Sequence, residues 1–142
     1  MDNESYMGEV KKVYLTWDDV NRLLDLLYDQ TKGQVSLVTG VPRGGTLLAI
    51  MFSHRFNVEY TRWASNHYPD MLIIDDIADS GVTLQEWKKD FHVPKYGTLH
   101  YKNISKVKPD FYSKEVDEDY GWIVYPWEQR NAKTIQNYLE NK

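Results

Sequence analysis

Hydrophobic and polar positions along the chain follow two alternating periods, one typical of strands and one typical of helices. Short apolar runs predict four strands, at residues 34–39, 58–63, 71–74 and 97–101. Apolar residues at helical spacing predict helices at residues 46–56, with Leu47, Leu48, Ile50 and Met51 available for burial, and at residues 84–91. This alternation predicts an α/β fold with a mainly parallel sheet flanked by helices, whose ligand sites lie outside the carboxyl ends of the strands.

The N-terminal part of the chain predicts a first helix. Residues 1–12 are polar and charged, and we expect them to be frayed. Thr16 and Asp19 have the spacing of a capping box. The residues that then recur at helical spacing, before a stop at Gly33, are Val20, Leu23, Leu24 and Leu27. This helix is expected to cover one face of the sheet.

The C-terminal part has weaker periodicity. We expect residues 102–119 to be irregular with one short strand, and residues 122–125 to form a strand that Pro126 stops. Residues 128–139 predict a terminal helix. The chain has 142 residues and shows no linker or repeat, so a single domain over residues 1–142 is expected.

Composition restricts the classes of function. A net charge of −4 provides no broad basic field, so neither nucleic acid nor a membrane is expected as a partner. The absence of cysteine excludes disulfides, thiolate nucleophiles and Cys-based metal sites. The sequence shows no signal-peptide core and no run of about 18 apolar residues, so we expect a soluble, cytoplasmic protein.

Residues 71–84 carry the most informative chemistry. The apolar run 71–74 ends at Asp75 and Asp76, and Asp79 precedes the turn Ser80, Gly81, Val82 and Thr83. Backbone N–H groups of such a turn suit a phosphate. Carboxylates beside a phosphate require a ligand that offers hydroxyl donors or a hard cation, such as a ribose diol with Mg²⁺. The alternative is an Asp-rich strand end whose acids only cap the next helix. Residues 73–84 resemble the phosphoribosyl pyrophosphate (PRPP) loop of the type I phosphoribosyltransferases.

A second glycine-rich stretch lies at residues 40–46. Its glycine spacing is that of a Walker phosphate loop, but Thr46 and Leu47 replace the lysine and hydroxyl residues that the Walker motif requires. The remaining chemistry is a tight turn with one guanidinium, on Arg43; the alternative is a strand-to-helix turn with an incidental arginine. The stretch resembles the family's pyrophosphate loop, which implies that Arg43, Gly44 and Gly45 bind pyrophosphate and that a non-proline cis peptide precedes Arg43 or adjoins it.

The region expected to bind a base lies near the C-terminus. Lys102 leaves a predicted strand, and its ammonium can donate to an oxo group; Trp122 can stack on a ring. Alone, each has an ordinary alternative, a solvated lysine and a core tryptophan. Residues 108–112 and 122–128 resemble the C-terminal part of the bacterial and archaeal xanthine-guanine and hypoxanthine-guanine phosphoribosyltransferases.

The resemblance implies a pentosyltransferase of purine salvage that converts guanine, hypoxanthine or xanthine plus PRPP into a nucleoside 5′-monophosphate and pyrophosphate. It implies that Lys102 contacts the 6-oxo group, Trp122 stacks on the purine, and the Ile123 carbonyl meets the 2-position. Asp79 is implied as the general base near N7. Asp75 and Asp76 are implied to hold ribose hydroxyls and Mg²⁺, with the metal nearest Asp76. A homodimer or homotetramer is also implied.

One departure from the family favours an alternative function. Only about fourteen residues separate the helix that ends near Phe56 from the strand that begins at Met71, where the family inserts a longer flexible hood over PRPP. Residues 60–68 are a candidate remnant of it, in which Arg62 and Ser65 could replace part of its function. The alternative is a catalytically weak PRPP- or nucleotide-sensing regulator. A pyrimidine-specific transferase is a third possibility, which Lys102 and Trp122 disfavour.

Overall fold

The structure, a computed structural model, describes residues 4–7 and 10–128. They fall into two compact units, one of residues Leu23–Asp117 and one of the described residues before Leu23 and after Asp117. The terminal helix predicted at residues 128–139 lies outside the described residues, apart from Glu128. The single domain expected over residues 1–142 stays a prediction.

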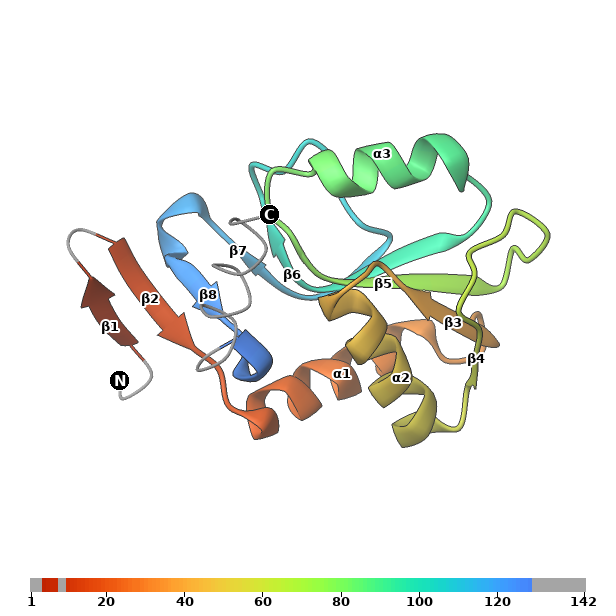
Figure 1. Ribbon diagram of the computed structural model, residues 1–142, viewed down its shortest axis with the longest axis horizontal. Coiled ribbons are helices and arrows are strands. Elements are labelled where there is room, and N and C mark those ends of the chain that lie inside the picture. The colour runs from red at the N-terminus through yellow and green to blue at the C-terminus, as the bar shows by residue number, and fades with distance from the viewer. Residues whose placement is uncertain (1–3, 8–9, 129–142) are drawn as a thin grey trace, which may run out of the picture. The chain divides into compact units, whose positions relative to one another are not determined.

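The unit Leu23–Asp117 is built on a five-stranded parallel sheet of order β4-β3-β5-β6-β7. Its strands are β3 (Leu37–Gly40), β4 (Glu59–Tyr60), β5 (Met71–Ala78), β6 (Lys95–Lys102) and β7 (Phe111–Val116). Helix α3 (Val82–Asp90) covers one face, while α2 (Gly44–Phe56) and the part of α1 (Trp17–Thr31) from Leu23 onward cover the other (Figure 1). The predicted α/β fold with a parallel sheet is confirmed.

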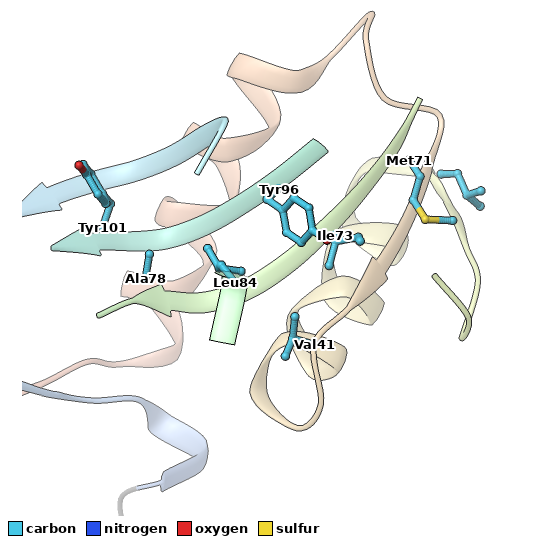
Figure 2. Close-up of a cluster of buried hydrophobic side chains, with 8 residues drawn as sticks. Val41, Met71, Ile73, Ala78, Leu84, Tyr96 and Tyr101 are labelled. Atoms are coloured by element: carbon cyan, nitrogen blue, oxygen red, sulfur yellow. The ribbon is translucent and has the colours of Figure 1, made fainter. Parts of the chain in front are cut away.

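Buried side chains fix α3 to the strands. Leu84 of α3 lies in a cluster with Ile73 of β5 and Tyr96 of β6, which are register partners (Figure 2). All three are 1% exposed or less, and complete burial of such a side chain contributes about 1.5–3 kcal/mol. The Tyr96 hydroxyl donates to the Phe91 carbonyl oxygen at 2.6 Å, so its polar end is satisfied. The start of α3 is thereby held beside the end of β5.

Strand β5 is longer than the sequence predicted. It continues to Ala78 because β6 pairs with it beyond Ile74, whereas β3 ends at Gly40, the register partner of Ile74. Asp75 and Asp76 therefore lie within a strand, not in a loop that follows it. Past Ile74 the β3 side of this strand has no ladder partner within the described sheet, which leaves room for a cavity there.

Two further expectations are corrected within this unit. The strand predicted at residues 58–63 is limited to β4, Glu59–Tyr60. In α2 the buried residues are Gly45, Leu48, Ala49 and Phe52, whereas Ile50 is 41% exposed. The helix faces the sheet with a different stripe because its phase is set by Gly45, which packs directly against the β5 backbone at Ile74.

The terminal unit contains a separate three-stranded sheet. Strand β1 (Glu4–Met7) pairs antiparallel with β2 (Val10–Tyr14), and β2 pairs parallel with β8 (Trp122–Val124). The expected fraying of residues 1–12 is therefore wrong for 4–7 and 10–12, because β2 gains a partner from the far end of the chain. The capping box is confirmed: the Thr16 N–H donates to Asp19 Oδ2 at 2.8 Å, and the Asp19 N–H donates to Thr16 Oγ1 at 3.1 Å.

The remaining predicted elements follow the sequence closely. Helix α1 begins at Trp17 and ends at Thr31, two residues before Gly33, whose φ is 85°. The short strand expected within residues 102–119 is β7, and β8 ends just before Pro126. Among the described residues, no helix is long and apolar enough to cross a membrane.

Candidate active site

A cavity of about 290 Å³ opens in the unit Leu23–Asp117 at the carboxyl ends of β3 and β5. The chain passes outward from β3 to β4 and then returns past β3 to β5, from which β6 and β7 extend to the other side. The crevice between β3 and β5 is thus a topological switch point, where open α/β sheets bind ligands. The lining residues are Val41, Pro42, Arg43, Gly44, Asp75, Asp76, Ile77, Ala78, Asp79, Ser80, Gly81, Thr83 and Leu84.

Two helix N-termini reach this cavity. Helix α2 begins at Gly44 after Arg43, and α3 begins at Val82 after Gly81. Neither N-cap residue makes a side-chain capping hydrogen bond, and at α3 the Ser80 Oγ accepts from the Val82 N–H at 3.3 Å. The first N–H groups of a helix lack intrahelical acceptors and carry partial positive charge. Each end is therefore suited to an anion such as a phosphate, and the cavity offers two of them.

Close backbone packing explains the glycines around the cavity. A Cβ on Gly45 would collide with the Ile74 carbonyl oxygen, so only glycine lets α2 start against β5. Gly81 has φ 89°, and a Cβ there would lie 2.7 Å from the Lys106 backbone nitrogen. The Lys106 N–H also donates to the Ser80 carbonyl oxygen at 2.9 Å. This support from Lys106 was missed, because nothing in its charged, aperiodic segment indicates a contact so distant in sequence.

The peptide bond between Pro42 and Arg43 is cis. A cis peptide before Arg43 is one of the two positions that the family resemblance implied. Arg43 is the N-cap residue of α2 and lies in the wall of the cavity. The residues predicted to bind pyrophosphate thus begin where one uncapped helix begins.

The two adjacent acids of β5 lie in the cavity wall. The Asp76 N–H donates to Asp75 Oδ1 at 2.9 Å, and the Ile77 N–H donates to Asp76 Oδ1 at 2.8 Å. Burial and the neighbouring charge of Asp76 raise the pKa of Asp75 to about 8. Burial also raises the pKa of Asp76. Ionising both groups is thus unfavourable until a ligand supplies hydrogen-bond donors or positive charge.

The third acid of the cavity has a different environment. Asp79 Oδ1 lies 3.2 Å from Lys102 Nζ. The lysine side chain is 13% exposed and the aspartate side chain 47% exposed. The ammonium is therefore largely buried, whereas the carboxylate that it contacts is accessible to a ligand. Sequence reasoning assigned these two residues to the same base, and the structure places them in direct contact.

The structure brings most of the predicted site residues together. Gly45, Val82 and Lys102 are not among the lining residues: Gly45 packs on β5, Val82 is exposed as the first residue of α3, and Lys102 contacts the lining residue Asp79. Trp122 and Ile123 belong to β8 of the terminal unit, where Trp122 is 55% exposed and Ile123 is buried. Their assignment to the purine stays a prediction.

The donor set fits a hard cation that keeps part of its own shell. Carboxylate oxygens are ligands that Mg²⁺ prefers, and Mg²⁺ is commonly held by one or two carboxylates together with water and substrate phosphates. Among the described residues, no group of three His, Cys, Asp or Glu side chains forms a ready-made metal cage. Asp76, with Asp75 beside it, could therefore bind such an ion jointly with a phosphorylated ligand.

Comparison with known proteins agrees with this geometry. No family model matches the sequence. The xanthine-guanine phosphoribosyltransferase of Cereibacter sphaeroides is 24% identical over 147 residues, covering 83% of this chain and 87% of that protein. A purine phosphoribosyltransferase from Pyrococcus horikoshii superposes with a TM-score of 0.67 at 26% identity, covering 83% of this chain and 95% of that one.

A further solved structure has the same fold. The Helicobacter pylori xanthine-guanine-hypoxanthine phosphoribosyltransferase superposes with a TM-score of 0.72 at 21% identity, covering 91% of this chain and 99% of that one. The predicted parallel sheet with flanking helices agrees with the fold of these solved structures. The chain therefore has the type I phosphoribosyltransferase fold and is homologous to the xanthine-guanine phosphoribosyltransferases.

Proposed function

We propose that the chain is a purine phosphoribosyltransferase of salvage metabolism, a pentosyltransferase that converts guanine, hypoxanthine or xanthine and PRPP into the nucleoside 5′-monophosphate and pyrophosphate. The observation that carries this proposal is that two helix N-termini without an N-cap side chain line the same cavity as two adjacent carboxylates, the buried Asp75 and the half-buried Asp76. PRPP has a 5′-phosphate and a 1-pyrophosphate on either side of a ribose diol, which matches that arrangement. Homology to enzymes named for purines supports the choice of base.

The proposed roles follow the position of each residue. The turn Ser80–Thr83 holds the 5′-phosphate, and Arg43 with the Gly44 and Gly45 amides holds pyrophosphate. In the reaction the bond between ribose C1′ and pyrophosphate breaks, and a bond from C1′ to the purine nitrogen forms. Asp79 takes the proton that the purine loses at N7.

The base is held by three groups in this proposal. The Lys102 ammonium donates to the 6-oxo group, the Trp122 ring stacks on the purine, and the Ile123 carbonyl oxygen faces the 2-position. A 6-oxopurine suits the Lys102–Asp79 pair, because its oxo group accepts from the ammonium while its N7–H donates to the carboxylate.

Asp76, assisted by Asp75, is the proposed ligand of Mg²⁺. When bound, the ion supplies positive charge to the leaving pyrophosphate. Asp75 and Asp76 orient the ribose by accepting hydrogen bonds from its hydroxyls. A cytoplasmic homodimer or homotetramer is proposed on the family resemblance.

A sensor of PRPP or nucleotides is a second candidate function, and the short hood favours it. Fourteen residues, 57–70, connect α2 to β5. Asn66 ties this connection to the end of α3: its Nδ2 donates to the Asp90 carbonyl oxygen at 2.9 Å, and its Oδ1 accepts from the Val93 N–H at 3.1 Å. A short, tethered loop is less able than a long hood to close over a reacting ribose and exclude water.

An ultraviolet assay with PRPP, Mg²⁺ and each of guanine, hypoxanthine, xanthine and adenine tests the proposal. We expect PRPP-dependent product from at least one 6-oxopurine and none from adenine. Asp76→Asn should lower kcat/KM for PRPP by about a hundredfold or more, since it removes a proposed metal ligand. The matched control is Asp29→Asn, whose exposed carboxylate lies 3.6 Å from Lys32 Nζ, and it should keep full activity. PRPP binding in calorimetry without any product would instead support the sensor, and absence of both would reject both functions.

A further inference from the structure

A second, larger cavity lies beside the first in the unit Leu23–Asp117. Its volume is about 620 Å³, and it shares Pro42 and Arg43 with the first cavity. Three stretches of chain form its walls: the end of β3 with the turn into α2, β4 with the connection that follows it, and α3 with the residue after it. The lining residues are Gly40, Pro42, Arg43, Thr46, Tyr60, Arg62, Trp63, Ala64, Trp87 and Phe91.

The two cavities differ in chemistry. Three acids line the first cavity, whereas no carboxylate is found among the described residues that line the second. Its charged groups are the guanidiniums of Arg43 and Arg62, and aromatic rings make up much of its wall. Such a cavity attracts an anion without a metal, and it favours a ligand with a planar aromatic part.

Its aromatic walls are held in place. Trp87 of α3 and Phe91, which follows the end of α3, have ring centroids 5.6 Å apart, and both pack against the buried cluster around Leu84. Facing residues come from the connection that Asn66 ties to the end of α3. There the Arg62 guanidinium lies 4.9 Å from the centroid of Trp63, and Trp63 itself is 70% exposed. The wall thus combines the packed rings of Trp87 and Phe91 with the accessible ring of Trp63, which lies beside the Arg62 guanidinium.

We propose that this second cavity is a binding site for a purine nucleotide, distinct from the first cavity. The base would stack on the Trp63 side of the cavity, and the phosphate would bind the guanidiniums of Arg62 and Arg43. The volume of the second cavity exceeds what a phosphate alone would fill. A simple anion would also leave the aromatic side chains of the cavity exposed to water. Because no acid is among the described lining residues, binding here needs no divalent metal.

Arg43 belongs to both cavities, so a nucleotide in the second would draw its guanidinium away from pyrophosphate. That coupling rests on the proposed function. The binding itself does not, and it is measured without turnover.

The test is calorimetric titration of the full chain with guanosine 5′-monophosphate in the presence of EDTA, together with quenching of tryptophan emission. We expect two molecules bound per chain. Thr83→Asp places a negative charge at the start of α3 and should leave one. In that background, Trp63→Ala or Arg62→Gln should weaken the remaining site about tenfold or more. Trp17→Ala and Arg22→Gln, which alter an exposed ring and an exposed guanidinium outside the second cavity, should not.

Several results would overturn the site. Binding of a single molecule per wild-type chain that Thr83→Asp abolishes would do so, as would a second molecule whose affinity is unchanged by both Trp63→Ala and Arg62→Gln. A Trp63→Ala variant that changes only the sedimentation of the protein, with nucleotide stoichiometry intact, would assign this face to contact with a second copy of the chain instead.

Discussion

The acids of the first cavity lie in two different electrostatic environments. Asp75 and Asp76 are consecutive residues of β5 whose pKa values are raised by burial, and for Asp75 also by its charged neighbour. Asp79, at the end of the same segment, has the ammonium of Lys102 at 3.2 Å. Asp75 and Asp76 suit a ligand that brings hydrogen-bond donors or a cation. Asp79 already has a cation beside it, which a ligand must share.

The difference separates the two ends of the proposed substrate pair. A ribose diol only donates to Asp75 and Asp76, so the carboxylates need no protein cation beside them. A 6-oxopurine both donates and accepts, which is what Asp79 and Lys102 offer together. An adenine offers an amino group where Lys102 needs an acceptor, and a lysine facing it would lose its hydrogen bond.

The largest expected effect comes from removing the paired acid. Asp79→Asn should lower kcat by about 10²–10⁴-fold, because the amide cannot take the purine proton, while PRPP affinity changes little. Steady-state kinetics with a 6-oxopurine and calorimetry with PRPP measure the two quantities. The control is Lys102→Gln, which breaks the same ion pair from the other side but keeps the carboxylate. It should raise the purine KM more than it lowers kcat. Equal losses of kcat in both variants would show that the ion pair matters and not the proton acceptor.

For Asp75 and Asp76, the expected effect is a pH dependence of thermal stability. The folded pKa of Asp75, about 8, lies above its ordinary value of 3.8. The contribution of Asp75 to the free energy of unfolding is therefore fully present below about pH 4 and is lost as the pH rises through 8. The reason is that ionisation of Asp75 costs more free energy in the folded than in the unfolded protein. Asp75→Asn cannot ionise, so without metal it should raise Tm at pH 8 by about 4 °C or more, and by almost nothing near pH 4.

Thermal unfolding monitored by circular dichroism in EDTA checks this. Asp110→Asn is a poor control, since that carboxylate accepts a hydrogen bond from the Tyr96 N–H. Asp29→Asn is better, because its exposed carboxylate pairs with Lys32 one helical turn away. A Tm difference for Asp75→Asn that is the same at both pH values would contradict a raised pKa.

Local motifs in the sequence already group most of the residues that line the first cavity. Asp75, Asp76, Asp79 and the Ser80–Thr83 turn are consecutive in the chain, so their grouping needs no knowledge of the fold. The same holds for the capping box of Thr16 and Asp19, which the structure confirms. A motif of this kind indicates which functional groups are present, but it does not predict how the strand that carries them pairs with other strands.

What could not be predicted depends on partners distant in the sequence. The extension of β5 to Ala78 requires β6, and the strands near the N-terminus require β8. The second cavity takes its rings from β4, the connection after it and α3, so Tyr60, Trp63 and Trp87 form no recognisable pattern in the chain. The ion pair of Asp79 with Lys102 likewise appears only when β5 and β6 lie side by side.

The smallest effect is expected from an ion pair outside the cavities, which provides a reference for Asp79 and Lys102. Arg55 Nε donates to Asp25 Oδ1 at 2.7 Å and Nη2 donates to Oδ2 at 2.9 Å, with both side chains more than 40% exposed. The hydrogen bond from Arg55 lowers the pKa of Asp25, so its contribution is present above the ordinary pKa and is lost as the pH falls. Water and salt screen an exposed pair, so Arg55→Gln should lower Tm by no more than about 3 °C at neutral pH, and by less at high salt. Lys102→Gln, which removes a largely buried ammonium from beside an acid, should show a salt dependence that is weaker than this. Equal salt dependence of the two variants in thermal unfolding would mean that the Asp79 pair is as well solvated as a surface pair, and the contrast between the cavity and the surface would fail.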